Sequence, residues 1–203
     1  MRILIILVCF TNTLYNSSIN YAGGECMKTK FLGVIFAILF SLTSLAKENN
    51  MENTLYLDLK DGRVVIELLP ELAPKHVVRI KELVKKNFYD GIVFHRVIGG
   101  FMAQTGDPTG TGAGGSGHKL KAEFSKEPHV RGVVSMARSQ NPDSADSQFF
   151  IVFDDARFLD GQYTVFGKVT KGMEFVDKIK KGDDDLNGQV NNPDKIIKMH
   201  LAK

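Results

Sequence analysis

Short apolar runs separated by turn residues are the feature that most constrains this chain. The runs cover 54–60, 63–68, 92–98, 101–105, 132–137, 148–153, 163–170 and 195–201, with Gly, Pro, Asn or Asp between them. Several of them alternate apolar and polar residues, which is typical of strands with one buried face. Helical patterns are few, and they do not alternate regularly with strands. The sequence therefore predicts a mainly β protein, a closed antiparallel barrel or a sandwich.

Local signals predict one hairpin and two helices. Asp61-Gly62 joins the first two runs, and Asp-Gly between alternating segments is a strong hairpin signal. A helix is expected over 73–87, where Pro74 suits the first turn because the missing N–H is not needed there. A second, shorter helix is expected over 172–180. The apolar positions of the two helices are Val77, Ile80, Leu83 and Val84 in the first, and Met173, Val176 and Ile179 in the second.

The N-terminal region has the layout of a secretory signal peptide. Lys28 and Lys30 precede an apolar stretch over 31–42, and small residues at Ser44 and Ala46 follow it. A membrane anchor is the alternative, but the stretch is shorter than the roughly 20 residues that a span needs. We therefore expect residues 27–46 to be a signal peptide, removed after Ala46, and residues 47–203 to be one exported domain.

Residues 1–26 precede a complete signal, so we interpret them as a mis-assigned upstream extension, with Met27 as the true start. Both cysteines, Cys9 and Cys26, lie before the predicted cleavage point. The mature chain then has no cysteine, which excludes a disulfide scaffold, a catalytic thiol and a thiolate metal site. The chain has 26 basic and 23 acidic residues and no long basic run, so a nucleic-acid-binding surface has little support.

Arg96 is the first candidate for chemistry, because it interrupts an apolar run. Alternation along a strand places it on one face with Phe94 and Ile98, while His95 points to the other face. An arginine exposed on a strand surface is the alternative interpretation. The adjoining Gly-Gly turn and the apolar neighbours favour a functional one.

Gln104 is the second candidate, and its alternative is a buried amide that satisfies backbone groups. Alternation groups Met102 with Gln104, and Phe101 with Ala103. The later run 148–153 repeats a polar-plus-aromatic combination, with Gln148 and Phe150 on one face. No nucleophile or pair of carboxylates accompanies these residues.

The remaining motifs do not support other chemistries. The glycines of 110–117 follow no strand and open no helix, so we interpret this segment as a tight or flexible loop and not as a nucleotide-binding fingerprint. Ser135 and Ser147 lack the surroundings of a hydrolase serine. The histidines have no metal-ligand spacing. Residues 180–194 are predicted to form a surface loop.

Three long blocks resemble the signature blocks of the cyclophilin family. They are FHRVIGGFMAQTGDPTGTGAGG, VSMARSQNPDSADSQFFI and RFLDGQYTVFGKV, in the family's order and approximate spacing. The similarity covers about 53–201, and the residues of the second block resemble those of the bacterial single-domain branch. The resemblance implies a closed eight-stranded antiparallel β-barrel capped by two α-helices.

The resemblance also implies peptidyl-prolyl cis-trans isomerase activity without a cofactor or metal. It assigns catalysis to Arg96, with Gln104 supporting the arginine. The residues implied in substrate binding are His95, Ile98, Phe101, Met102, Gly112, Ala137, Arg138, Ser139, Gln148, Phe150, Phe158, Leu159 and Tyr163. The implied partners are proline-containing unfolded or extended polypeptides. The implied oligomeric state of the protein is a monomer. A non-catalytic proline-peptide module and a holdase chaperone are the alternatives.

Three positions depart from the eukaryotic pattern of the family. Phe158 stands where many members have Trp, Tyr163 where many have His, and Arg138 where Asn is common. None of them is the catalytic arginine. We expect the missing indole donor at 158 to weaken binding of cyclosporin, the family's cyclic-peptide inhibitor. With the signal peptide, the resemblance predicts an exported folding enzyme, in the periplasm of a cell with two membranes.

Overall fold

The computed structural model describes residues 51–202. The predicted upstream extension over 1–26 and the predicted signal peptide over 27–46 lie outside the described residues. Among the helices of residues 51–202, none has the length and apolar character that crossing a membrane requires.

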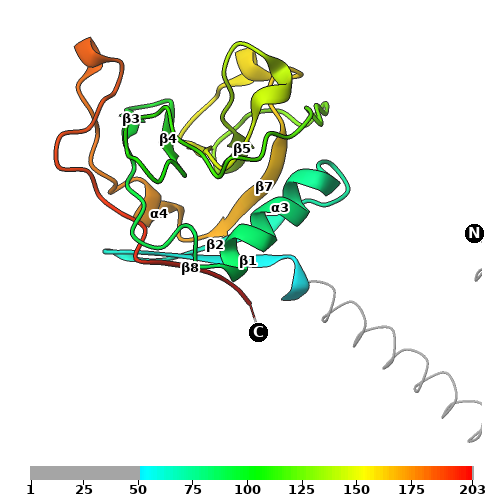
Figure 1. Cartoon of the computed structure of the whole chain (residues 1–203). Helices are drawn as coiled ribbons and strands as arrows, with labels where there is room; N and C mark the ends of the chain where they lie inside the picture. Colours follow the sequence, from blue (N-terminus) through cyan, green and yellow to red (C-terminus); the bar gives the residue numbers. More distant parts are fainter. Residues whose placement is uncertain (1–50, 203) are drawn as a thin grey trace, which may run out of the picture. The chain divides into compact units, whose positions relative to one another are not determined.

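The described chain forms one strongly curled antiparallel sheet, as the sequence predicted (Figure 1). The strands lie in the order β3-β4-β6-β5-β7-β2-β1-β8. Their bounds are β1 Thr54–Leu59, β2 Gly62–Leu68, β3 Arg96–Ile98, β4 Met102–Thr105, β5 Val133–Met136, β6 Phe149–Val152, β7 Val165–Lys171 and β8 Lys198–Leu201. The eight-stranded, mainly β prediction is confirmed.

Backbone bonds join the two edges of the sheet just before β3 and β8. Phe94 N donates to Asp194 O at 2.9 Å, and Ile196 N donates to Ile92 O at 2.9 Å. Val93 and Lys195 form an isolated antiparallel bridge in the same place. Backbone groups of the segments that lead into the two edge strands are thereby paired within the molecule.

The predicted hairpin forms where Asp-Gly stands. β1 and β2 pair antiparallel with Leu57 opposite Val64, and both side chains are fully buried. Gly62 begins β2 at a place where a larger residue would not fit, because a Cβ on it would lie 2.6 Å from the ring of Phe175. The turn glycine therefore also lets the second helical segment pack closely.

Two α-helices accompany the sheet. α3 spans Pro74–Lys85 and contacts β8, and its buried side includes Val77 and Ile80, as the apolar stripe predicts. α4 spans only Met173–Val176 and contacts β2, so the helix predicted over 172–180 is shorter than expected. Three 3-10 turns complete the elements: η1 Pro142–Ser144, η2 Arg157–Leu159 and η3 Asp184–Leu186.

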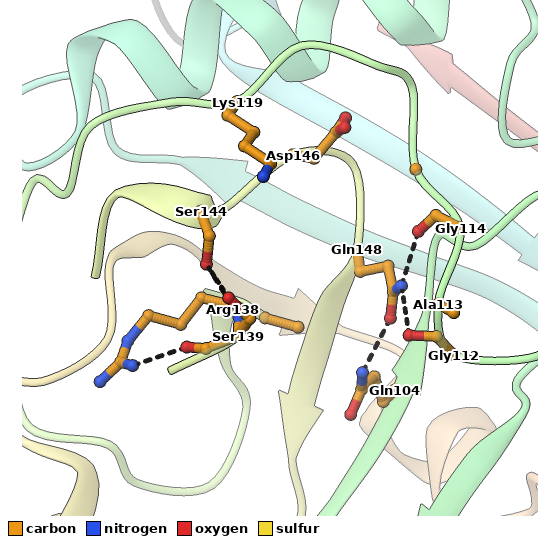
Figure 2. A pocket seen from close by; sticks show the side chains of 12 residues that line it. Gln104, Gly112, Ala113, Gly114, Lys119, Arg138, Ser139, Ser144, Asp146 and Gln148 are labelled. Carbon is orange, nitrogen blue, oxygen red and sulfur yellow. Dashed lines mark hydrogen bonds between the residues drawn. The ribbon is translucent and has the colours of Figure 1, made fainter. Parts of the chain in front are cut away.

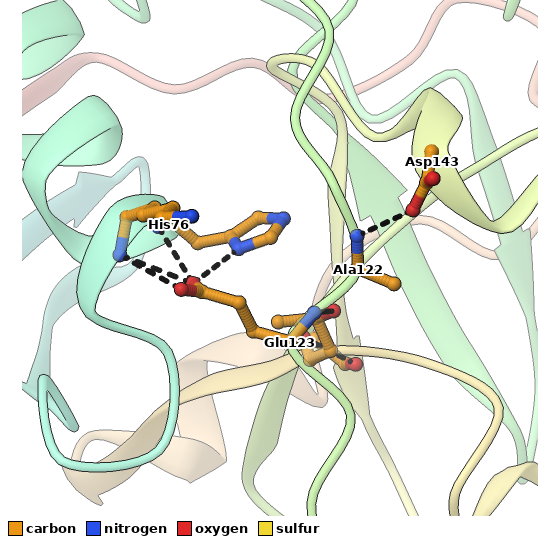
Figure 3. A network of polar contacts seen from close by, with 7 residues as sticks. His76, Ala122, Glu123 and Asp143 are labelled. Carbon is orange, nitrogen blue, oxygen red and sulfur yellow. Dashed lines mark hydrogen bonds and ion pairs between the residues drawn. The ribbon is translucent and has the colours of Figure 1, made fainter.

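A distant carboxylate holds the N-terminus of α3, because Ala73 at its N-cap has no capping side chain. Glu123 accepts hydrogen bonds from the backbone N–H groups of Lys75 and His76, and its Oε2 lies 2.7 Å from Nδ1 of buried His76 (Figure 3). Burial alone would raise the pKa of Glu123, but these hydrogen bonds hold it below its usual value. The interaction fixes the loop 121–124 against the helix.

The core consists of two apolar clusters, and the smaller one supports the candidate site. The larger cluster includes Phe94, Val97, Ala103, Phe149 and Ile151. The smaller cluster, which we call the site-side cluster, consists of Met102, Val133, Phe150, Val152, Ala156, Leu159 and Val165. Alternate residues of β6 thus enter different clusters, as expected for a strand buried on both faces.

Two face assignments from the sequence are wrong, and both fall just outside a strand. Phe94 was grouped with Arg96, but it packs in the larger core cluster because β3 begins only at Arg96. Phe101 was grouped with Ala103, but it packs against the site-side cluster because it lies in the turn before β4. Alternation holds only where the backbone is extended.

Candidate active site

Strand register brings Arg96, Gln104 and Phe150 side by side. Arg96 on β3 lies directly opposite Gln104 on β4, and Gln104 lies opposite Phe150 on β6. Directly opposed residues of antiparallel strands project to the same face, within contact distance. Three segments far apart in the chain therefore place a cation, an amide and an aromatic ring in one row.

The guanidinium of Arg96 is held from two sides. Its Nη1 donates to Gln104 Oε1 at 3.3 Å, its Nη2 donates to Asn187 Oδ1 at 2.9 Å, and its Nε donates to the backbone oxygen of Asn187 at 3.0 Å. Partial burial lowers the pKa of Arg96, which nevertheless stays charged at any physiological pH. An arginine has five N–H groups, so these contacts leave one on each terminal nitrogen for a ligand.

An apolar pocket of about 300 Å³ opens beside Arg96. We call it the proline pocket, after the ligand that the cyclophilin resemblance implies. Its lining residues are Arg96, Phe101, Met102, Gln104, Ala137, Arg138, Phe150, Phe158, Leu159 and Tyr163. Met102 is 1% exposed and Phe150 is 4% exposed, so the floor consists of core side chains. Phe158 is 65% exposed and packs against Phe101 with ring centroids 5.3 Å apart, so it forms the outer rim.

A buried polar chain lies behind Phe150. His129, fully buried, stacks on Phe150, and its Nδ1 and Nε2 lie 3.0 Å and 3.1 Å from Asp160 Oδ1 and Ser135 Oγ. This order of groups is that of a hydrolase triad. However, Ser135 is also fully buried and donates to the backbone oxygen of Thr164 at 2.9 Å, so no substrate can reach it. These hydrogen bonds hold His129 in place, and His129 fixes the back wall of the proline pocket.

A second cavity of about 330 Å³, the polar pocket, adjoins the first and shares Gln104, Ala137 and Arg138 with it. Figure 2 shows Gln148 at its centre. Gln148 Nε2 donates to the backbone oxygens of Gly112 and Gly114, at 3.0 Å and 2.7 Å, and Gln148 Oε1 accepts from Gln104 Nε2 at 2.9 Å. A continuous row of hydrogen bonds therefore runs from the glycine loop through two amides to Arg96.

Two carboxylates shape the glycine loop over 110–117. Asp107, 1% exposed, accepts from the N–H groups of Thr109, Gly112 and Gly114 at 2.7, 2.6 and 3.1 Å. Asp146 accepts from Ser116 N at 2.8 Å and from Gly117 N at 2.9 Å. Burial alone would raise the pKa of Asp107, but the hydrogen bonds lower it to about 2. The loop is thus tightly held, and the element that follows it in the described chain is strand β5 and not a helix.

His95 lies under the loop, with no catalytic contact to Arg96. Its ring is 8% exposed, and neither ring nitrogen has a hydrogen-bond partner within residues 51–202. Burial lowers its pKa, which favours the neutral ring. A Cβ on Gly112 would sit 3.5 Å from the ring, so the ring supports the loop from below.

The structure brings most of the sequence-predicted residues into these two pockets. Gly112, Ser139 and Gln148 line the polar pocket, and the aromatic residues and Leu159 line the proline pocket. Ile98 packs against the site-side cluster, and His95 lines a third cavity, which Arg96 and Gln104 also line. Within the part of the chain that the structure describes, no group of three His, Cys, Asp or Glu side chains is placed to hold a metal.

Several lining residues were missed by the sequence analysis. They are Ala113, Gly114, Gly115, Lys119, Ser144 and Asp146 in the polar pocket, and Asn187 and Gln189 beside Arg96. Asn187-Gly188 is a turn signal in the sequence, and it predicts only a surface loop there. Its contact with Arg96 depends on tertiary pairing, which no local pattern reveals.

Taken together, the fold and the site define a small curled-sheet protein with an apolar pocket next to a fixed cation. No exposed nucleophile lies in the proline pocket, so the site suits a change of conformation better than the cleavage of a bond. A five-membered proline ring has the size and apolar character for such a pocket.

Comparisons with known proteins identify this class. The family described as cyclophilin type peptidyl-prolyl cis-trans isomerase/CLD matches residues 54–201. A probable peptidyl-prolyl cis-trans isomerase of Brucella suis biovar 1 is 58% identical over 174 residues, which are 80% of this chain and 89% of that protein. Peptidyl-prolyl cis-trans isomerase B of Bacillus subtilis is 47% identical over 131 residues, which are 63% of this chain and 91% of that protein.

Solved structures agree. The crystal structure of a cyclophilin type peptidyl-prolyl cis-trans isomerase of Cryptosporidium parvum, in the presence of the dipeptide Ala-Pro, matches with a TM-score of 0.68 at 29% identity. The match covers 74% of this chain and 99% of that one. The chain therefore belongs to the cyclophilin family. It is a peptidyl-prolyl cis-trans isomerase, as the sequence blocks predicted.

Proposed function

We propose that Arg96 accelerates rotation of the X-Pro bond by stabilising the twisted amide. The barrier to rotation is roughly 20 kcal/mol and arises from lost amide resonance. In the twisted state the proline nitrogen becomes pyramidal and basic. A guanidinium N–H donated to that nitrogen stabilises the twisted state more than either planar state.

The observation that carries this proposal is the position of Arg96. It lines the mouth of the apolar pocket, its Nε–Nη2 edge is occupied by Asn187, and Gln104 takes a further N–H. The remaining N–H groups therefore belong to a guanidinium whose orientation is fixed by hydrogen bonds. A 10⁵-fold acceleration requires about 7 kcal/mol of differential stabilisation. Fixed charge, exclusion of water and ring packing supply this together.

The substrate is a proline-containing, unfolded or extended polypeptide. The proline ring enters between Phe101, Met102 and Phe150, and the preceding residues follow Ala137 to Ser139 into the polar pocket. Two facts support this path: the pockets share three residues, and the Cryptosporidium relative was crystallised in the presence of Ala-Pro. The reaction uses no cofactor, and a monomer contains every group that it needs.

The enzyme acts on exported proteins, with the mature chain starting at Lys47. Support comes from the lysines, the apolar stretch and the small residues that precede Lys47, and from the absence of cysteine after it. N-terminal sequencing of the enzyme from fractionated cells tests this assignment. A cytosolic enzyme, or a mature N-terminus before residue 27, would contradict it.

Arg96→Ala tests the mechanism. With the purified 47–203 domain and a short X-Pro peptide, kcat/KM should fall by about 10²-fold or more, as on removal of a transition-state donor. The melting temperature should stay within a few degrees, because Arg96 is only partly buried. Arg157→Ala is the matched control, since Arg157 is exposed and pairs with Asp155. An Arg96→Ala variant that folds and keeps its activity would exclude the mechanism.

A further inference from the structure

The loop that joins η3 to β8 contributes the second support of Arg96. This loop was expected to be a solvent-exposed connection, yet it reaches the strand that carries the arginine. Asn187 contributes both of its oxygens: the backbone oxygen accepts from Nε and Oδ1 accepts from Nη2. The two oxygens occupy the side-on edge of the guanidinium, which a carboxylate occupies in a bidentate ion pair.

Backbone pairing places the loop in register with β3. Val97 N donates to Gly188 O at 2.8 Å, Gly182 N donates to Val97 O at 2.8 Å, and Val190 N donates to His95 O at 3.1 Å. Arg96 lies between the two residues that make these bonds. The loop therefore cannot shift along β3 without breaking contacts to both neighbours of the arginine.

The conformation at Asn187 suits asparagine. Its φ of 54° and ψ of 36° lie in the left-handed region, which asparagine tolerates better than most residues. Gly188 follows with a φ of 76°, and a Cβ there would lie 2.4 Å from Ile98 Cγ1. Asn-Gly is thus the pair that lets the loop turn closely against β3 while pointing an amide at Arg96.

We propose that Asn187 is a positioning residue for Arg96. It holds the side-on edge of the guanidinium so that the end-on edge faces the X-Pro bond, which rotates and is not cleaved. This inference rests on the proposed role of Arg96. Gln104 alone makes one contact at 3.3 Å, about which the guanidinium could still rotate. The two bonds from Asn187 remove that rotation. Positioning of this kind affects turnover more than ground-state binding of the peptide.

Asn187→Gly is the decisive variant. Glycine keeps the left-handed backbone and the backbone oxygen, and it removes the side chain, whose contact with Arg96 is made by Oδ1. We expect kcat to fall about fivefold to tenfold, with KM changed less than twofold, because a hydrogen bond to a charged group is lost at a partly solvated site. Asn187→Asp, which restores the acceptor, should return kcat to within about threefold of the parent.

Asn192→Gly is the matched control. Asn192 also has a left-handed φ, of 51°, on the same connection, and it makes no hydrogen bond to Arg96. Its replacement should leave kcat unchanged. Equal losses in the two glycine variants would show a general effect of loop flexibility and would overturn the inference.

Two further measurements separate this inference from the proposed mechanism. In an Arg96→Lys background, which lacks the guanidinium edge, Asn187→Gly should have less than a twofold effect; a full effect there overturns the inference. NMR of the Arg96 Nε–H group should show greater mobility in Asn187→Gly than in the parent or in Asn192→Gly. If Arg96→Ala stays active, the mechanism fails, while the NMR result still tests positioning. If Arg96→Ala is inactive and Asn187→Gly is fully active, only the positioning role fails.

Discussion

The proline pocket and the polar pocket share a boundary, but different forces hold their walls. The walls of the proline pocket are core side chains on strands, such as Met102 and Phe150, which are almost fully buried. The polar pocket is closed by the glycine loop, whose backbone N–H groups point at Asp107 and Asp146. The first pocket is therefore as stable as the core itself, whereas the second depends on a few charge-assisted hydrogen bonds.

This difference suits the two tasks that the proposed function gives to the pockets. The ring of a substrate proline has one shape, so a rigid apolar pocket serves all substrates. The residues before the proline vary, and a surface of backbone oxygens, amides and hydroxyls accepts varied partners. Changes in the buried floor of the proline pocket should thus affect stability and turnover together, while changes around the polar pocket should affect mainly the loop.

Phe150→Ala should have the largest effect. Phe150 is 4% exposed and contacts the rings of both His129 and Tyr163, so its removal leaves a cavity in the core as well as in the pocket. We expect a loss of about 3–5 kcal/mol in unfolding free energy, measured in urea, and a loss of most isomerase activity. Phe158→Ala is the control: at 65% exposure it should change stability by about 0.5 kcal/mol or less. Similar losses of unfolding free energy in the two variants would contradict the difference between the floor and the rim of the pocket.

Asp107→Asn should have an intermediate effect. The amide keeps one acceptor oxygen but loses the charge that holds the N–H groups of Gly112 and Gly114. We expect destabilisation by about 1–3 kcal/mol. Activity should fall more for peptides with several residues before the proline than for a dipeptide-sized substrate, because the polar pocket loses its shape. Equal losses on both substrates would argue that the loop acts on Arg96 and not on peptide binding.

The pH dependence of stability provides a third test. The folded-state pKa of Asp107, about 2, is lower than its ordinary value of 3.8, so its contribution is complete above about pH 4 and is lost as the pH falls through about 2. The difference in unfolding free energy between the parent and Asp107→Asn should therefore shrink between pH 4 and pH 2. Other paired carboxylates, such as Glu123, titrate in both proteins and cancel in this difference. A difference that stays constant with pH would show that Asp107 acts through shape alone.

The sequence predicted the proline pocket better than its surroundings, for physical reasons. Arg96, Gln104 and Phe150 interrupt or occupy regular strands, so alternation and the cyclophilin resemblance both locate them. Phe94 and Phe101 lie one or two residues outside β3 and β4, where alternation fails, and strand ends are hard to place from propensity alone. The helix over 172–180 was overestimated for a similar reason, since its last predicted apolar position, Ile179, is buried without helical backbone.

Residues outside the strands were harder to predict. Asp146 lies 30 residues from Ser116, whose N–H it binds, and Asn187 lies 91 residues from Arg96. Such contacts are decided by how loops close over the sheet, and a single sequence shows only that these loops are polar and rich in glycine. The resemblance gave no help with Asn187, because its signature blocks do not include the connection over 180–194. Asp146 lies inside the second block, but the resemblance implied no role for it.

The smallest effect on the enzyme should come from Phe158→Trp, at the rim of the proline pocket. Phe158 is largely exposed and its ring already packs on Phe101, so a larger ring should leave stability and kcat/KM within about twofold. The indole adds an N–H donor that phenylalanine lacks. If the rim and not the floor determines sensitivity to cyclosporin, the variant should bind that peptide about threefold to tenfold more tightly, as one added hydrogen bond allows. Calorimetric titration of both proteins measures this, with proline-peptide binding as the internal reference. An unchanged cyclosporin affinity would show that the floor and the polar pocket, and not residue 158, limit binding of the inhibitor.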